Sequence, residues 1–222
     1  MYIPRHFRQD DSAVLHDFIR SHPLATLIVH GGDGFDANHV PLLLDPEAGT
    51  HGVLRGHVAR ANPVWHAAVD GIPALAVFHG PQAYVSPGWY PSKRDDPKVV
   101  PTWNYAVVHA HGTLTTIDDP DWLYTLVTAL TEAHEQPRPT PWQVTDAPPE
   151  FIERMVGAIV GIELTVERLE GKWKLSQNRS TIDRGGVVAG LRDQGGARND
   201  ALADFMGAEN PERSGHDDDG IE

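Results

Sequence analysis

The sequence contains no cysteine, and this absence excludes disulfide bonds, thiolate catalysis and iron–sulfur clusters together. It also lacks an apolar run of about eighteen residues, the length that a membrane-spanning helix requires. The first residues, "MYIPRHFRQDDSAVLHDF", contain no continuous apolar stretch of the signal-peptide type. We therefore expect a cytoplasmic protein that has no membrane segment.

The sequence signatures of several common enzyme and DNA-binding classes are also absent. No G-x-G-x-x-G follows a strand, no Walker A motif occurs, and no G-x-S-x-G elbow is present. No helix-turn-helix pattern stands in a basic context. These absences argue against a Rossmann dehydrogenase, a P-loop NTPase and an α/β-hydrolase.

Basic residues are scarce, since 18 Lys and Arg face 31 Asp and Glu and the formal net charge is −13. An acidic surface repels a phosphate backbone unless its basic residues are segregated onto one face, so direct DNA binding is doubtful. Part of the acidic excess lies in residues 209–222, which we expect to form a disordered tail. No repeat or linker divides the rest of the chain, so residues 1–208 are expected to form a single domain.

The hydrophobic pattern predicts strands and helices that do not alternate regularly along the chain. Strands are expected at 24–30, 35–45, 51–58, 73–80, 102–117 and 162–174. Helices are expected at 10–21, 62–70, 118–135 and 148–158, with helical pieces broken by Gly-Gly pairs over 177–208. The glycines of residues 31–34 favour a hairpin and hence an antiparallel sheet. We predict a mainly β fold of the α+β class, a closed or partly closed barrel with peripheral helices.

Residues 83–105 concentrate aromatic side chains in a segment that also holds four prolines. The aromatic residues are Tyr84, Trp89, Tyr90, Trp103 and Tyr105. Prolines at this density exclude a long helix, so these side chains lie on short extended pieces and turns. They either fill a core or form a flat wall for a partner. Because Trp and Tyr carry polar tips that need partners when buried, their use here favours an interface or a planar ligand.

The segment "LRGHVARANPVW" (54–65) suggests an anion site. Asn62 is a good helix cap and Pro63 favours the first helical position, so Asn62-Pro63 is expected to open a helix shortly after Arg60. The free N–H groups of a first turn beside an arginine are the geometry that binds a phosphate. The plainer alternative is a capped helix with a surface arginine.

The segment "EGKWKLSQNR" (170–179) ends a predicted strand with lysines and short polar residues. Lys172 and Lys174 share one face of that strand. Ser176 and Gln177 supply donors and acceptors that could recognise hydroxyls or ring heteroatoms. Polar capping of the next helix is the alternative, and the net charge argues against a platform for single-stranded nucleic acid.

Histidine is frequent, with 13 residues, and His109 and His111 fall on the same face of one predicted strand. Metal ligands in barrels sometimes have this spacing. The other histidines offer no third and fourth ligand at a readable spacing, and no carboxylate stands in a fixed pattern with them. We therefore expect no metal site.

Six segments, taken together and in this order, resemble the PaiB-type family. Its members are described as FMN-binding negative transcriptional regulators within the flavin-reductase-like split-barrel superfamily. The segments are "MYIPRHF", "ANHVPL", "LRGHVARANPVW", "FHGPQAYVSPGWY", "VPTWNYAVVHAHG" and "IVGIELTVERLEGKWKLSQNR". The resemblance implies a split β-barrel that forms a homodimer, with FMN in a groove between the protomers.

The resemblance also implies roles for residues inside the matching segments. Arg60 and Asn62 become candidates for binding the FMN phosphate. Asn38 and His39 become candidates for the edge of the isoalloxazine ring or for the ribityl chain.

A second set of implied residues lies later in the chain. Trp103, with its neighbour Asn104, is expected to form a wall beside the flavin ring. Lys174, Ser176 and Gln177 are expected to reach the flavin, with the other protomer as a possible source of these three.

The function that the resemblance implies is an FMN-binding transcriptional regulator. Because the chain is acidic and shows no base-reading element, we expect any effect on transcription to be indirect, through the flavin or through a partner. The first alternative is an FMN-dependent oxidoreductase of the flavin-reductase or pyridoxamine-phosphate-oxidase type. A less favoured alternative is a haem-binding relative of the split barrel, with a histidine as axial ligand.

Overall fold

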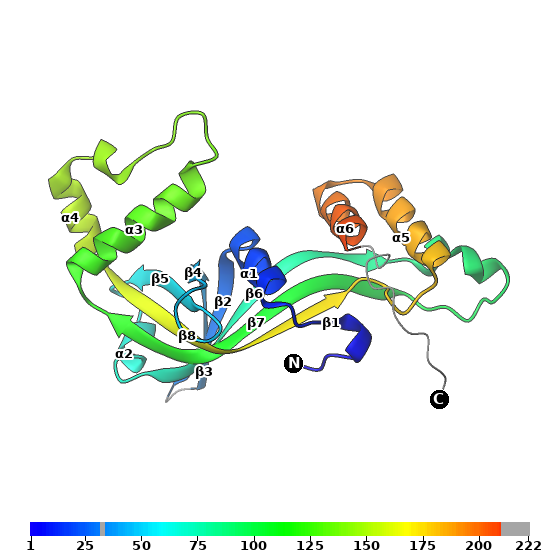
Figure 1. Ribbon diagram of the computed structural model, residues 1–222, viewed down its shortest axis with the longest axis horizontal. Helices are drawn as coiled ribbons and strands as arrows, with labels where there is room; N and C mark the ends of the chain where they lie inside the picture. The colour runs from blue at the N-terminus through cyan, green and yellow to red at the C-terminus, as the bar shows by residue number, and fades with distance from the viewer. Residues whose placement is uncertain (32–33, 210–222) are drawn as a thin grey trace. The chain divides into compact units, whose positions relative to one another are not determined.

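The computed structural model describes residues 1–31 and 34–209, and its main element is a sheet of eight strands (Figure 1). The strands are β1 (Arg8–Gln9), β2 (Leu24–Gly31), β3 (Gly34–Pro41), β4 (Leu43–Asp45), β5 (Val53–Ala59), β6 (Ile72–Val85), β7 (Thr102–Ile117) and β8 (Ile159–Lys174). Their order is β3-β2-β6-β7-β8-β5-β4, and β1 pairs with β8. Residues 32–33 of the predicted hairpin and 210–222 of the predicted tail lie outside the described residues.

In the part of the chain that the structure describes, six α-helices and four 3₁₀ turns accompany the sheet. The helices are α1 (Ser12–Ser21), α2 (Val64–Ala67), α3 (Pro120–Glu135), α4 (Pro149–Gly157), α5 (Thr181–Gln194) and α6 (Ala197–Ala208). The 3₁₀ turns are η1 (Arg5–Phe7), η2 (Pro87–Trp89), η3 (Pro91–Arg94) and η4 (Val144–Asp146). None of the described helices combines the length and the apolar character needed to cross a bilayer.

The chain forms two compact units. Among the described residues, the first unit contains Met1, Gln9–His79 and Val107–Gly171, and the second contains Tyr2–Arg8, Gly80–Ala106 and residues 172–209. Strands β6, β7 and β8 contribute residues to both units. That residues 1–208 fold as one domain stays a prediction.

The first unit holds both ends of the sheet path. The predicted strand 35–45 is wrong in one respect, because the chain breaks at Leu42 into β3, which pairs with β2, and β4, which pairs with β5. Pro41 has no N–H for a ladder, and the Leu42 N–H donates to the Pro23 carbonyl instead, at 2.9 Å. A Cβ on Gly56 of β5 would lie 2.8 Å from a Leu42 methyl, so this glycine makes room for the crossing.

Two helices of the first unit begin where their capping residues predict. The Asp11 side chain accepts hydrogen bonds from Ala13 N and Val14 N, and α1 then buries Leu15, Phe18 and Ile19. The Asp119 side chain accepts from Trp122 N at 2.8 Å, and Pro120 opens α3. Sequence analysis placed both helices correctly to within two residues.

In the second unit, helices pack on one face of the strands. Ala83, Val85, Asn104, Ala106 and Trp173 are buried, while alternate residues of the same strands are exposed or half-buried. Helices α5 and α6 pack against each other in this unit. The result is a sheet with one covered face and one accessible face.

The expected break of the C-terminal helices at Gly-Gly pairs is half right. Gly195 and Gly196 separate α5 from α6, and both have positive φ. Gly185 and Gly186, however, lie inside α5. A Cβ on Gly186 would collide with the carbonyl oxygen of Trp89, so close packing of η2 offsets the low helix propensity of glycine there.

The predicted fold class is confirmed. The structure is an antiparallel eight-stranded sheet with peripheral helices. In the described residues the strand path stays open, so the sheet is not a closed barrel. Strand β6 is longer than the predicted 73–80 and enters the aromatic segment, whereas α2 is shorter than the predicted 62–70. The sequence analysis also missed the short strands β1 and β4.

Candidate functional site

The nine residues predicted to bind FMN fall into two clusters, one in each unit. The β3–β5 cluster, in the first unit, comprises Asn38, His39, Arg60 and Asn62. The β7–β8 cluster, in the second unit, comprises Trp103, Asn104, Lys174, Ser176 and Gln177. The two clusters are described separately.

The β3–β5 cluster is organised around Asn62. Its side-chain oxygen accepts from Val64 N at 3.0 Å, and its amide nitrogen donates to the Asn38 side-chain oxygen at 2.7 Å. The predicted cap is wrong by one position, because the helix begins at Val64 and Pro63 is its N-cap residue. The Asn38 amide donates to Asp36 at 3.0 Å. The helix that follows has only four residues, so its N-terminus lacks the strong dipole of a long helix. The hydrogen bond from Val64 N to Asn62 therefore stabilises this turn alone.

Arg60 already has an anionic partner. Its guanidinium donates to both carboxylate oxygens of Asp118, at 2.9 and 2.6 Å, and to the carbonyl oxygens of Gly157 and Ile159. These contacts use four of its five N–H groups. The hydrogen bonds within the pair raise the pKa of Arg60 and lower that of Asp118. A phosphate at this position would therefore have to compete with Asp118.

His39, the fourth member of the β3–β5 cluster, is exposed on β3. It lies opposite Thr26 of β2, and the Thr26 hydroxyl is 3.2 Å from the His39 Nδ1 atom. This contact holds the ring at the surface and leaves Nε2 directed elsewhere. The imidazole can therefore donate to or accept from a small polar ligand.

The β7–β8 cluster presents an accessible aromatic surface. The Trp103 side chain is 42% exposed, and Tyr84 on β6 is 48% exposed. The two rings meet edge to face with centroids 6.4 Å apart, and the Trp103 indole N–H donates to Gln82 at 3.2 Å. Trp103 and Tyr84 thus form an accessible aromatic wall, and the polar tip of the indole has a hydrogen-bond partner.

A lysine stands beside that wall. The Lys174 ammonium donates to the Trp103 carbonyl oxygen at 2.7 Å and to the Thr102 hydroxyl. Burial and the charge of Lys172 lower the pKa of Lys174. Lys172 itself lies over the rings of Tyr2 and Tyr105, so positive charge and aromatic rings alternate in this part of the second unit.

The other members of the β7–β8 cluster support the backbone. Asn104 and Ser176 are buried and hydrogen-bond to each other at 2.9 Å. Ser176 has a φ of 64°, a left-handed conformation that an L residue adopts at some cost. Gln177 accepts from Leu175 N at 2.8 Å and donates to the Trp173 carbonyl at 2.6 Å. Ser176 and Gln177 therefore shape the chain reversal after β8.

Part of the aromatic segment 83–105 fills the core, which is one of the two roles that its sequence left open, and the wall for a partner stays a prediction. Tyr90 is buried, and its hydroxyl has no hydrogen-bond partner in the described part of the chain. Trp89 packs so closely on α5 that a Cβ on Gly190 would overlap its ring. Tyr84 and Trp103 instead remain accessible. The segment thus packs against a helix through Trp89 and leaves the rings of Tyr84 and Trp103 accessible.

Sequence reasoning missed Glu170, which lies beside His109 and His111 in the first unit. The His111 Nε2 atom is 3.0 Å from the Glu170 Oε2 atom. Burial, helped by the charge of His111, lowers the pKa of His109 to about 4, so its ring is neutral near pH 7. Glu170 is distant in sequence and on another strand, so no spacing rule could have revealed it.

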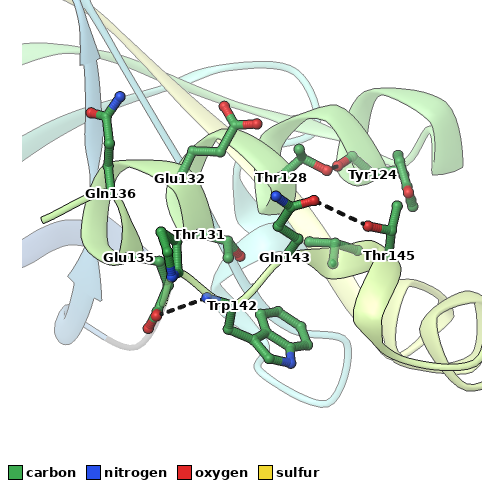
Figure 2. Close-up of a pocket in the computed structure, with 11 residues that line it drawn as sticks. Tyr124, Thr128, Thr131, Glu132, Glu135, Gln136, Trp142, Gln143 and Thr145 are labelled. Atoms are coloured by element: carbon green, nitrogen blue, oxygen red, sulfur yellow. Dashed lines mark hydrogen bonds between the residues drawn. The ribbon is translucent and has the colours of Figure 1, made fainter. Parts of the chain in front are cut away.

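A pocket of about 510 Å³ lies between α3 and the segment around η4, also in the first unit (Figure 2). Tyr124 and Trp142 line it together with the carboxylates of Glu132 and Glu135. None of its lining residues is Lys or Arg. Because carboxylates repel an anion, the pocket does not suit the phosphate of a nucleotide.

The two clusters differ in how well their side chains match the parts of an FMN molecule. The β7–β8 cluster offers an exposed indole and an ammonium, which match a planar ring with hydrogen-bond acceptors on its edge. The β3–β5 cluster offers amides and a guanidinium, the groups that bind phosphate, but the guanidinium is paired with Asp118. The residues present fit FMN, with competition at the phosphate end.

Comparisons with known proteins agree with these features. The family model described as "Putative FMN-binding domain" matches residues 1–168. "Protease synthase and sporulation protein PAI 2" from Bacillus subtilis is 30% identical over 206 residues, covering 93% of this chain and 96% of that protein. An uncharacterised protein from Emericella nidulans is 32% identical, covering 93% of this chain and 96% of its own length.

Two solved structures share the fold at low sequence identity. The FAD and heme binding protein from Mycobacterium smegmatis superposes with a TM-score of 0.53 and 15% identity, covering 82% of this chain and 80% of that one. The conserved hypothetical protein Rv2991 from Mycobacterium tuberculosis gives a TM-score of 0.55 at 13% identity, covering 80% and 92%. At these identities the likeness concerns the fold alone.

Proposed function

The chain belongs to the family described as "Putative FMN-binding domain", and from that membership we propose that it is a dimeric flavoprotein whose effect on transcription is indirect. FMN is the cofactor that the family model and the fold support. We further propose which residues bind FMN, that a second copy of the chain contributes to the site, and that the flavin affects transcription through a partner.

The accessible wall of Trp103 and Tyr84 carries the proposal. The indole of Trp103 and the phenol of Tyr84 are nearly half exposed. A planar ligand or a second copy of the chain would cover this apolar area. Trp103 would hold the isoalloxazine ring by aromatic contact, and the Lys174 ammonium would supply a donor for its polar edge. Asn104 and Ser176 fix the backbone on which Trp103 and Lys174 stand. Gln177 sets the chain direction after β8.

The β3–β5 cluster binds the other end of the cofactor. Arg60 and Asn62 hold the phosphate, and Asn38 and His39 hydrogen-bond to the ribityl chain or the ring edge. In a homodimer the β3–β5 cluster of one protomer and Lys174, Ser176 and Gln177 of its partner contribute to the same FMN. Bound FMN supplies one- and two-electron redox chemistry, and these residues bind, orient and shield it.

Regulation without direct DNA binding follows from charge. A chain with a net charge of −13 has little affinity for a phosphate backbone. The described residues show no basic helix that could read a groove. We infer that the flavin state is communicated to a partner protein. Tight, salt-sensitive binding of the purified protein to one promoter fragment would contradict this route.

A second function, FMN-dependent oxidoreductase, is favoured by one observation. The ammonium of Lys174 lies beside an accessible aromatic wall, so it could stabilise negative charge on a reduced ring that a substrate can reach. Steady oxidation of NADH or NADPH by the FMN-loaded protein would favour this reading. If the protein oxidises neither NADH nor NADPH, the result would favour the regulatory function.

The test starts from the purified full chain. Its absorption spectrum and the mass of any co-purified molecule identify the cofactor, since flavin absorbs near about 450 nm and haem near about 400 nm. Equilibrium dialysis then measures the FMN affinity of the wild type, Trp103→Ala and Trp142→Ala. Trp142 is a matched control because it is 45% exposed but lies outside both clusters.

We expect Trp103→Ala to weaken FMN binding by roughly 1–3 kcal/mol, about 5- to 150-fold, and Trp142→Ala to leave it unchanged. Light scattering should report a dimer for the wild type. A monomeric protein that takes up no added FMN would refute the proposal.

A further inference from the structure

Two histidines and a glutamate of the first unit come together across neighbouring strands. His109 and His111 occupy alternate positions of β7, so their side chains project from the same face. Glu170 lies on β8, the next strand in the sheet order. One nitrogen of each imidazole and one carboxylate oxygen all lie within 4.8 Å of one another. The sheet thus brings together three metal-ligating side chains that the sequence separates.

The spacing suits a single small cation. Zinc binds imidazole nitrogen and carboxylate oxygen at about 2.0–2.2 Å, so two ligands of one ion stand roughly 3–4 Å apart. The His111 Nε2 and Glu170 Oε2 atoms are already 3.0 Å apart, and the two imidazole centroids are 6.0 Å apart. Small side-chain rotations would therefore direct all three ligand atoms at one point.

The surroundings hold the carboxylate in place while leaving the cluster reachable. Arg168 contacts the Glu170 Oε1 atom at 2.6 Å, and the Met1 amine contacts Oε2 at 3.2 Å. The side chains of His111 and Glu170 are 27% and 20% exposed. An outer partner such as Arg168 orients a ligating carboxylate, whereas a metal at Oε2 would take the place of the Met1 ammonium.

We propose that His109, His111 and Glu170 form a binding site for a divalent transition-metal ion. Two imidazoles and one carboxylate are a donor set that suits zinc, iron and related ions and disfavours magnesium and calcium, which prefer oxygen ligands. Three protein ligands leave a further coordination position open to water or a substrate. The site belongs to the first unit and contains none of the nine residues proposed to bind FMN, so it does not rest on that proposal.

The experiment uses Zn²⁺ and Co²⁺ as probes on the full chain after treatment with a chelator. Calorimetric titration and metal analysis should give one Zn²⁺ per chain. We expect His111→Ala and Glu170→Gln each to weaken Zn²⁺ binding by more than about 100-fold, because loss of an outer partner alone costs about 10–100-fold. Glu170→Gln keeps the side-chain shape, which limits effects on folding.

Glu167→Gln is the matched control. It makes the same change on the same strand, at a residue that accepts from the Thr113 hydroxyl and lies outside the cluster. It should bind Zn²⁺ as the wild type does. Co²⁺ should give visible bands of a nitrogen- and oxygen-ligated ion that disappear in Glu170→Gln, while circular dichroism and FMN binding of that variant stay unchanged. A wild-type chain that binds no Zn²⁺, or a Glu170→Gln variant that binds it as tightly as the wild type, would overturn the proposal.

Discussion

The β3–β5 and β7–β8 clusters contain similar polar side chains but differ in what those side chains already bind. In the first unit, Arg60 is paired with Asp118 and Asn62 with Asn38, so the cluster satisfies itself. In the second unit, Trp103 keeps a broad exposed surface next to Lys174. If the proposed site is right, uncovered aromatic area marks a ligand site more clearly than the presence of an arginine does.

The structural support of the two clusters differs as well. The Trp103 wall stands on strands whose other face is covered by packed helices, and α5 meets η2 through glycines that have no room for a side chain. The β3–β5 cluster is followed by a helix of only four residues. The second unit should therefore be sensitive to packing changes, and the first to changes in charge.

The largest effect is expected from packing in the second unit. Gly190→Ala places a methyl group within 2.6 Å of the Trp89 Cδ1 atom, so we expect the free energy of unfolding to fall by about 3 kcal/mol. Gly185→Ala is the control on the same helix, since a Cβ there meets nothing within 4 Å. It should raise the free energy of unfolding by up to about 1 kcal/mol. Urea denaturation that shows equal effects for the two variants would contradict the packing.

The next effect concerns the competition between Asp118 and a phosphate for Arg60. Arg60→Ala should weaken FMN binding by about 1.5–3 kcal/mol, the range for a hydrogen bond to a charged group. Asp118→Asn should strengthen FMN binding, because it removes a negative charge and frees the guanidinium. Flavin titration measures both. If both variants bind FMN as the wild type does, the phosphate does not lie at Arg60.

The smallest effect is a pH dependence in the second unit. Burial works to raise the pKa of Asp183, but hydrogen bonds from Ser92 outweigh it and lower that pKa below its usual value of 3.8. A carboxyl with a lowered pKa in the folded state stabilises the protein above pH 3.8, and this contribution disappears as the pH falls through the folded pKa.

Asp183→Asn should therefore cost about 1 kcal/mol of unfolding free energy at pH 7 and less at pH 3. Denaturation at the two pH values measures the difference. Asp118→Asn is the comparison in the first unit, where the ion pair is exposed and worth less than about 1 kcal/mol. A loss for Asp183→Asn that is the same at both pH values would show that the charge of the carboxylate plays no part.

Much of the fold could be predicted from local patterns. The alternation over 102–117 matches the bounds of β7, and the caps of α1 and α3 marked their starts. The predictions that were wrong concern segments whose structure depends on contacts between residues far apart in the sequence. Gly186 stays helical because Trp89 packs against it, and the strand 35–45 breaks because Leu42 passes over Gly56. A single sequence does not show which residues will meet in this way.

The candidate site was predictable in part for the same reason. The resemblance marked Arg60, and the residue type indicated an anion partner, but only the structure shows Asp118 in that role. The spacing of His109 and His111 suggested a shared face, but Glu170 comes from another strand. Charge partners and metal ligands are set by the register of strands, which no short motif records.

The contrast between an exposed Trp103 and a Trp173 that is only 3% exposed has a practical use. Indole emission shifts to longer wavelength in water, and iodide quenches only those rings that it can reach. Trp142 is 45% exposed as well, so red-edge excitation should select Trp103 over the buried indole in the Trp142→Ala variant. A flavin stacked on Trp103 would accept its excitation energy, so loss of that emission would follow cofactor loading in real time without any attached label.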